Sequence, residues 1–582
     1  MSLRDKINLN NVIKNTAIFL FFLFYFLSFL LKPVYNNDFW WHLATGKYIV
    51  ENKSLTKSDP FSYTTSDTPT TRKSIILKGY WLAQIIFYKI YNLWDLKGII
   101  ILRSLLLILF MFFVFLNIKK QGSSEFLTLL LTTGVFYIAK GFTGERPQLF
   151  TFFIFSLVYY LLEDFRINRS KKIFLIPPIV MLLANMHPGY IACILLITIY
   201  LAGEGINSLI KKEKNNRARK ILIIWILGVV FSMFNPNGPA VYVNIFSIGG
   251  HTEGIMEFMP TFSLYAKKVD PISYPYIIFL FLSIIGLRYI KKIGLVHILL
   301  LVVFSAMSFM SIRYLIFYMC VSAPILAGLI LNLKDERIFE KISGYLNQRE
   351  IILNSIACIA GIYLIFNTIP FLAKYEFKED TRFAFPKDAA DFLNKHEIKG
   401  NIFNEYGFGG YLIWRLYPEK RVFIDGRTLE PEFMNEYRTI ASADSGMQKS
   451  WEEIIGKYNI SYIVMPPLYP TGEIYPIVER LIENDDWALV YNDHLSLIFV
   501  KKNSQNDSFI KTFIKDKKES YNTIIIQASA RAKIKGVNPY YLIALGKVFY
   551  KMGRMDDARK AFLIAYERDP KNPIINEWLK KF

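Results

Sequence analysis

The sequence predicts a polytopic α-helical membrane protein with about eleven transmembrane helices, followed by an α/β domain and a short helical segment. Three observations predict this class. Hydrophobic residues make up 53% of the 582 residues and charged residues only 20%, whereas a soluble chain carries about 25% charge. The apolar residues come in long blocks. Between these blocks, segments rich in Lys and Arg alternate with segments that have few. The 49 Phe and 36 Tyr exclude a disordered chain.

The length of each apolar block sets the number of spans, because a bilayer core needs about 20 apolar residues per helix. The first block is too long for a cleavable signal peptide, and no small-residue cleavage site follows it. The fifth and sixth spans are separated by only a few residues, so a single merged span is the alternative there. We predict spans at 16–34, 98–117, 125–140, 148–163, 173–186, 189–206, 221–234, 273–290, 294–310, 314–332 and 351–371.

The distribution of Lys and Arg predicts the orientation of these spans. With residues 1–15 as a cytoplasmic tail, the segments on the inner side hold 22 Lys and Arg and the short outer loops hold 5. The part of the chain from 372 onward then lies outside the cytoplasm. The expected location of the spans is the plasma (inner) membrane. The net charge of +21 is thus a sign of topology. Nucleic acid is not an expected partner, because the basic residues do not cluster on a soluble face.

The first outer loop, 35–97, carries the strongest candidate for catalysis. It opens with Asp38 and His42 among aromatic residues, directly after the first span. A carboxylate at this depth is partly desolvated, which suits it to general-base chemistry. The alternative is structural: Asp38 would be the N-cap of a helix over 39–50.

Other polar residues are expected on the same side of the membrane. An Arg at the end of a span is often a snorkelling anchor, and a lone loop His is usually solvated. Their gathering at one membrane face is nevertheless a functional hypothesis, because charge at membrane depth is costly. These residues are Glu145, Arg146, Asn185, His187, His251, Glu253, Glu257 and Arg313.

The part of the chain after the last span divides in two. Residues 372–505 read as an α/β domain, with a helix at 386–395 and another near 447–458. Strands are expected at 400–404, 421–424, 461–465, 487–491 and 495–500. A glycine-rich stretch, 404–414, could cradle an anion, although it matches no nucleotide-binding fingerprint.

Residues 506–582 form the second part. Within them, 539–572 match one tetratricopeptide repeat of 34 residues. Such a repeat is either a structural cap or a docking site for a protein partner, and it needs neighbouring helices to bury its apolar face.

The layout resembles the GT-C class of polyprenyl-phosphate-dependent glycosyltransferases, distantly like oligosaccharyltransferase catalytic subunits and protein mannosyltransferases. The resemblance rests on the acid after the first span (Asp38), on Tyr406-Gly407, and on Asp425 at a strand end. The oligosaccharyltransferase motif Trp-Trp-Asp-Tyr-Gly is replaced here by Asn404-Glu405-Tyr406-Gly407. That departure argues against an Asn-X-Ser/Thr acceptor.

The resemblance implies roles for particular residues. Asp38 would be the general base, and Arg146 and Arg313 would neutralise the leaving lipid phosphate. A divalent metal, Mg or Mn, is possible at Glu145 and Glu257. The remaining residues expected to bind donor phosphate or acceptor are His42, His187, Tyr406, Gly407, Asp425 and Arg427.

Three functions remain open from the sequence. The first is a membrane glycosyltransferase that uses a polyprenyl-phosphate-linked sugar at the outer face. The second is a polymerase or ligase of surface polysaccharide, which would depend on outer-loop arginines rather than on Asp38. The third is a non-catalytic assembly factor of the cell envelope, whose tetratricopeptide tail recruits a protein partner.

Overall fold

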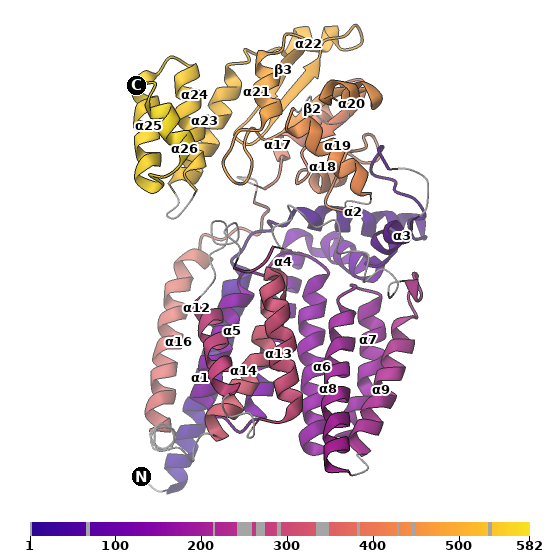
Figure 1. The fold of residues 1–582 in the computed structure, drawn as a ribbon, viewed down its shortest axis with the longest axis vertical. Helices are drawn as coiled ribbons and strands as arrows, with labels where there is room; N and C mark the ends of the chain where they lie inside the picture. The colour runs from indigo at the N-terminus through magenta and orange to yellow at the C-terminus, as the bar shows by residue number, and fades with distance from the viewer. Residues whose placement is uncertain are drawn as a thin grey trace. The chain divides into compact units, whose positions relative to one another are not determined.

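A computed structural model describes the protein over residues 3–65, 70–212, 216–240, 242, 259–262, 274–287, 293–332, 349–380, 384–427, 430–443, 450–533 and 538–582. The chain divides into two compact units (Figure 1). The first, here called the helical unit, comprises Met1–Val34, Lys78–Lys267 and Pro271–Lys378. The second, here called the sheet unit, comprises Tyr35–Leu77, Lys268–Asp270 and Glu379–Phe582.

A helix of the helical unit coincides with every predicted span. Six of the described helices are long and apolar enough to cross a membrane, and α5, α12 and α13 are shorter apolar helices. The helices are α1 (Leu3–Leu30), α4 (Trp81–Lys119), α5 (Glu125–Ala139), α6 (Gln148–Asn168), α7 (Ile176–Ala184, after the 3-10 turn Lys171–Leu175), α8 (Tyr190–Lys211), α9 (Asn216–Ser232), α12 (Tyr274–Leu287), α13 (Leu295–Met310), α14 (Leu315–Asn332) and α16 (Glu350–Leu372).

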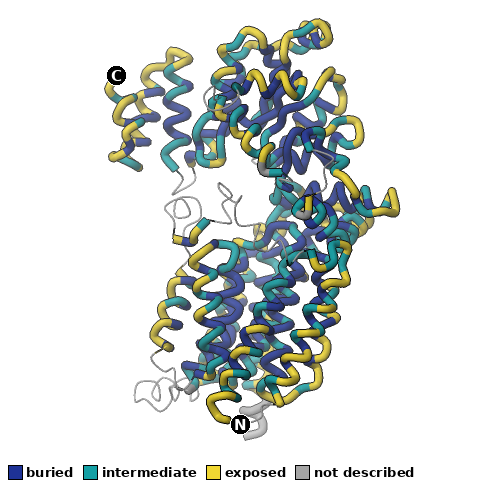
Figure 2. Tube along the Cα trace, turned by 45° about the vertical axis from the view of Figure 1, so that its right-hand side comes forward, coloured by how far each residue is buried: buried dark blue, intermediate teal, exposed yellow. Residues whose placement is uncertain are grey.

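The outer faces of this unit expose large apolar side chains. Phe281 of α12 and Ile359 and Phe366 of α16 are 62%, 68% and 70% exposed, and Figure 2 shows exposed stretches along helices of this unit. A water-soluble protein rarely exposes contiguous apolar surface of this kind, whereas lipid tails cover it without cost. The chain is a multi-pass membrane protein.

A buried polar network ties three helices of this unit, α6, α8 and α13, together. Glu163 of α6 accepts two hydrogen bonds from Arg166, at 2.9 and 2.8 Å, and one from the Tyr200 hydroxyl of α8. Gln121, which follows the end of α4, and His297 of α13 are hydrogen-bonded to the same carboxylate. Because every partner is supplied from within the unit, the network stabilises the bundle, and the sequence analysis had not selected it.

The sheet unit is built on four strands in the order β1-β2-β4-β3: β1 (Asn401–Asn404), β2 (Ile460–Met465), β3 (Trp487–Asn492) and β4 (Leu497–Lys501). β1 and β2 are parallel, β2 and β4 are antiparallel, and β3 and β4 form an antiparallel hairpin. Its helices are α17 (Lys387–Lys395), α18 (Gly409–Leu416), α19 (Pro431–Ala441), α20 (Trp451–Lys457), α21 (Pro476–Glu483) and α22 (Asp507–Phe513).

The strand predicted at 421–424 is wrong. Val422 forms an isolated parallel bridge with Ser62 instead. The side-chain amide of Asn404 explains this, because its oxygen accepts from the Phe423 N–H and its nitrogen donates to the Ile424 carbonyl. These bonds take the place of a ladder with β1.

The predicted first outer loop divides between the two units. Tyr35–Leu77 belongs to the sheet unit and supplies α2 (Asn37–Asn52) and most of α3 (Thr71–Lys78). The remainder enters α4, which is kinked at Asp95 (φ 52°, ψ −150°). The kink separates the segment that starts at Trp81 from the apolar remainder of α4.

The C-terminal segment is helical, as predicted. Its helices are α23 (Glu519–Ala532), α24 (Tyr540–Lys551), α25 (Met555–Arg568) and α26 (Pro573–Leu579), and they share one apolar core. Gly546 of α24 faces the Phe562 ring of α25, and a side chain at 546 would not fit there. The tetratricopeptide assignment and its protein partner stay predictions.

Candidate active site

The Asp38 carboxylate lies at the start of α2, in the sheet unit. Asn36 is the N-cap of this helix, since its side chain accepts a hydrogen bond from the Asp38 N–H at 3.0 Å. The structural alternative, in which Asp38 caps the helix, is therefore wrong. Asp38 stands in the first turn instead, where the helix dipole favours a negative charge.

Trp41 and Gly426 both lie against the Asp38 side chain. The indole Nε1 of Trp41 donates to Asp38 Oδ1 at 3.2 Å. The same oxygen lies against Gly426, so closely that a Cβ at position 426 would overlap it. Asp38 is half-buried, and its role as a general base stays a prediction.

The glycine-rich stretch of the sheet unit is filled by protein backbone. Gly410 is packed against the Asn37 carbonyl, and a Cβ there would lie 2.5 Å from that oxygen. Gly409 is packed in the same way against Ile424 and Asp425. These glycines thus let α2 and the 424–426 segment approach the start of α18. An anion cradle does not describe this stretch.

Glu405 and Tyr406 lie beside this contact. Glu405 accepts a hydrogen bond from the Phe408 N–H at 2.9 Å, and Tyr475 donates to it at 3.4 Å. Burial raises the pKa of the Glu405 carboxyl. The Tyr406 hydroxyl donates to the Gly426 carbonyl at 3.3 Å, so Tyr406 and Gly407 lie close to Asp38 within the sheet unit.

Asp425 and Arg427 belong to a buried ionic cluster, here called the clasp, which also contains Asp59 and Ser62. Arg427 donates to Asp425 Oδ1 at 2.7 Å, to Asp59 Oδ1 at 2.6 Å and to the Ser62 hydroxyl at 3.1 Å. Burial opposes the charge on Arg427, but the carboxylates of Asp425 and Asp59 raise its pKa. The clasp thus pairs one guanidinium with two acidic side chains.

His42 is buried, and its ring lies tilted by 32° against that of Trp41, at a centroid distance of 3.5 Å. Substrate binding by His42, Asp425 and Arg427 stays a prediction. Their surroundings favour a role in holding the first loop on the α/β core.

Three other predicted residues come together in the helical unit. His187 lies in the turn between α7 and α8, where Nδ1 accepts from the Gly189 N–H at 2.9 Å. Burial, and then the charges of Arg313 and Arg146, lower the pKa of His187. The imidazole is therefore neutral near pH 7, with its proton on Nε2, and the two guanidinium groups supply the positive charge.

Glu145, a predicted metal ligand, is occupied by another interaction. Its carboxylate forms a fully buried ion pair with Arg103 of α4. Arg103 also donates to the backbone carbonyls of Phe29 and Lys32 at the end of α1, at 2.8 and 2.5 Å. A metal ion at Glu145 would have to compete with this guanidinium. Glu257, the other predicted ligand, lies outside the described residues, as do His251 and Glu253.

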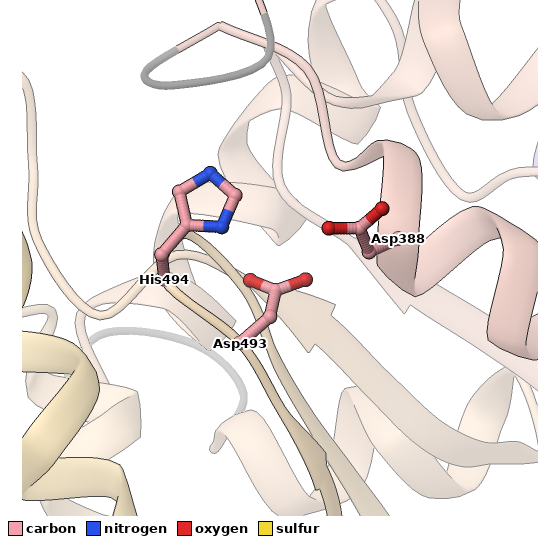
Figure 3. Close-up of side chains that lie close together, drawn as sticks. All are labelled: Asp388, Asp493 and His494. Carbon is pink, nitrogen blue, oxygen red and sulfur yellow. The ribbon is translucent and has the colours of Figure 1, made fainter.

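One group of side chains in the described part of the sheet unit has the composition of a cation site. Asp388 of α17 and the hairpin residues Asp493 and His494 have ligand atoms within 4.8 Å of one another (Figure 3). Asp493 also accepts hydrogen bonds from Leu495, Ser496 and Tyr491 that shape the hairpin turn. The hydrogen bonds of Asp493 account for its place in the hairpin turn. The carboxylate and imidazole ligands of the group are also of types that suit a divalent cation.

The sequence analysis missed Asn36, Asp59, Ser62, Arg103 and Gly426. Asp59 and Arg427 are 368 positions apart, and no spacing rule relates them. The side chain of Asp59 also fixes the turn that follows it, because it accepts a hydrogen bond from the Phe61 N–H at 3.0 Å.

Comparison with known proteins identifies solved structures with a similar fold. No family model matches the chain, and no curated protein matches its sequence. Two solved structures of the oligosaccharyltransferase of Archaeoglobus fulgidus are similar. The first, AglB in complex with an inhibitory peptide and a dolichol-phosphate, has a TM-score of 0.57 at 10% identity, over 93% of this chain and 86% of that chain. The second, in the apo form, has a TM-score of 0.54 at 10% identity, over 92% and 86%.

A third structure, ArnT from Cupriavidus metallidurans bound to undecaprenyl phosphate, has a TM-score of 0.45 at 11% identity, over 87% of this chain and 99% of that chain. The likeness to the oligosaccharyltransferase establishes that the chain has the GT-C fold.

Proposed function

We propose that this protein is a membrane glycosyltransferase that moves a sugar from a polyprenyl-phosphate donor to an acceptor at the extracytoplasmic face, with Asp38 as the general base. The observation that carries the proposal is the place of Asp38. It is a half-buried carboxylate held by Trp41, eight residues after the end of the first membrane helix, in a chain with the GT-C fold.

The proposed reaction needs one proton acceptor and one anion stabiliser. Asp38 takes the proton of an acceptor hydroxyl as the oxygen attacks the anomeric carbon. A new C–O bond forms, the bond from the anomeric carbon to the phosphate oxygen breaks, and the configuration inverts. The lipid phosphate leaves with the electron pair. General-base catalysis of this kind contributes about 10²–10⁴ in rate.

The polar group of the helical unit supplies the anion stabiliser in this proposal. Arg146 and Arg313 are both close enough to act electrostatically on His187. A guanidinium group can donate two parallel hydrogen bonds to the oxygens of one phosphate. Neutral His187 retains a hydrogen-bond donor at Nε2. The dolichol-phosphate bound to the AglB structure supports a lipid phosphate as the ligand class.

The acceptor is not specified by these residues. Glu405 stands in the place of the Asp of the oligosaccharyltransferase motif, and neither of the two residues directly before it is a tryptophan. A hydroxyl acceptor, rather than an Asn-X-Ser/Thr peptide, is therefore part of the proposal. Glu145 is held by Arg103, so a Mg or Mn ion would need other ligands.

The orientation belongs to the same proposal, with the N-terminus cytoplasmic, the sheet unit extracytoplasmic and the plasma membrane as location. Protease added outside spheroplasts should cleave the chain after Leu372 and leave residues 1–15 intact. Protection of the sheet unit would overturn this orientation.

The donor class is tested with purified protein and two labelled donors, a polyprenyl-phosphate monosaccharide and a polyprenyl-pyrophosphate oligosaccharide. Transfer from the first supports the proposal. Transfer from the second alone, lost in Arg146→Gln or Arg313→Gln and retained in Asp38→Asn, supports the polymerase or ligase. Transfer from neither donor, with partners retained by residues 506–582, supports the assembly factor.

A further inference from the structure

Gly426 is the residue on which the direction of the Asp38 side chain depends. We propose that Gly426 is a positioning residue: its lack of a side chain leaves the space in which the Asp38 carboxylate lies. The mechanistic part of this inference rests on the proposed role of Asp38. The geometric part stands on its own and is tested separately.

The contact between the two residues is unusually close. A Cβ added to Gly426 would lie less than 3.0 Å from Asp38 Oδ1, a separation that real Cβ atoms do not show, and 3.2 Å from Asp38 Cγ. The next neighbour is Trp41 Nε1 at 3.5 Å, an ordinary van der Waals distance. Among the nearest neighbours, only the Asp38 carboxylate in its present direction conflicts with a side chain at this position.

Backbone strain does not explain the glycine. Gly426 is not among the described glycines with a positive φ, so another residue could adopt its conformation. Close approach is the remaining reason, as it is for Gly409 and Gly410 on the adjoining surface.

The clasp holds Gly426 against Asp38. Gly426 stands between Asp425 and Arg427, whose side chains are bonded to each other, and Arg427 is bonded to Asp59 and Ser62. The Tyr406 hydroxyl donates to the Gly426 carbonyl. Because this backbone is fixed at both neighbours, an added methyl group cannot be relieved by moving residue 426. The Asp38 carboxylate must turn away instead.

The geometric part is tested by unfolding of the full chain in detergent. Gly426→Ala should lower the unfolding midpoint of the sheet unit by about 5 °C, as overpacking does. In an Asp38→Ala background the same change should cost nothing, since only the 3.5 Å neighbour remains. A loss of equal size in both backgrounds would overturn the proposal, and this readout needs no enzymatic activity.

The matched control is Gly456→Ala in α20, because nothing lies within 4 Å of the position that a Cβ would take at this glycine. It should not lower the midpoint, and it should not alter transfer. If Gly426→Ala prevents folding, restored folding of Asp38→Ala/Gly426→Ala supports the same conclusion.

The mechanistic part is tested by kinetics. Gly426→Ala should lower kcat for polyprenyl-phosphate sugar transfer at least about 100-fold, with the KM for the donor unchanged. The Asp38→Asn/Gly426→Ala protein should be no slower than Asp38→Asn, because both changes act on one group. Additive losses would overturn the positioning role. Wild-type protein that transfers no sugar would refute the proposed function while leaving the unfolding cycle valid.

Discussion

The clasp allows a quantitative prediction for Arg427→Met. The side chains of Arg427, Asp59 and Asp425 are 1%, 0% and 3% exposed. Methionine preserves the volume but removes the guanidinium, so two carboxylates remain buried without a cation. Breaking a buried ion pair in this way costs about 3–5 kcal/mol of unfolding free energy.

The effect is measured by urea unfolding of the full chain in detergent, followed by pulse proteolysis of the sheet unit. Arg427→Met should lose about 3–5 kcal/mol. Adding Asp59→Asn and Asp425→Asn should recover a large part of the loss, because the uncompensated charges are then gone. Lys511→Met is the surface control, since its pair with Asp507 is exposed, and it should show no measurable change.

An Arg427→Met protein that unfolds at the wild-type urea concentration would refute this reasoning. So would a triple variant that is less stable than Arg427→Met, since that result would mean that charge compensation is not what the clasp provides.

Three further predictions follow from the described contacts. Burial raises the pKa of Glu405. Between the pKa of an unfolded Glu, about 4.3, and the raised pKa of the folded state, the folded protein keeps a proton that the unfolded chain has released. The free energy of unfolding of the wild type should therefore fall as the pH rises through this interval. Glu405→Gln should gain stability relative to wild type over that interval, and equal midpoints at all pH values would contradict this. Arg103→Met should destabilise the helical unit by about 3–5 kcal/mol, and Glu145→Gln by less, as measured by thermal aggregation in detergent; a reversed order would contradict the pairing. The last prediction concerns metal: removal of metal with EDTA, followed by addition of Mg or Mn, should change the rate of sugar transfer equally in wild type and in Glu145→Gln, because Glu145 is paired with Arg103. Metal dependence that is lost only in Glu145→Gln would instead identify Glu145 as a metal ligand.

The membrane helices could be predicted because their signal is local. A block of apolar residues of sufficient length forms a helix in lipid whatever its neighbours are. The boundary between the spans around His187 was also correct, since Pro188 and Gly189 interrupt the pattern there.

The start of α2 shows where local signals fail. Asn36, Asn37 and Asp38 can all cap a helix, and the sequence does not choose among them. The choice of Asn36 places Asp38 in the first turn, against Gly426. That contact joins residues far apart in the chain.

The glycine-rich stretch and the segment at 421–424 were misread for the same reason. Both patterns are filled by the first loop: Gly410 meets the Asn37 carbonyl, and Val422 bridges to Ser62. No periodicity within residues 372–505 reveals that their partner precedes them by roughly 360 positions or more. The assignment of Asp425 and Arg427 to ligand binding followed from the resemblance, and no pattern in the sequence indicates that Asp59 is hydrogen-bonded to Arg427.

The central claim is that Asp38 removes a proton from the acceptor during transfer from a lipid-linked sugar. Its most direct test is the kcat of Asp38→Asn with a polyprenyl-phosphate sugar, beside Asp556→Asn, an exposed acid in the first turn of α25. The account predicts a loss of at least about 100-fold in Asp38→Asn and none in Asp556→Asn. Wild-type turnover in Asp38→Asn would contradict it.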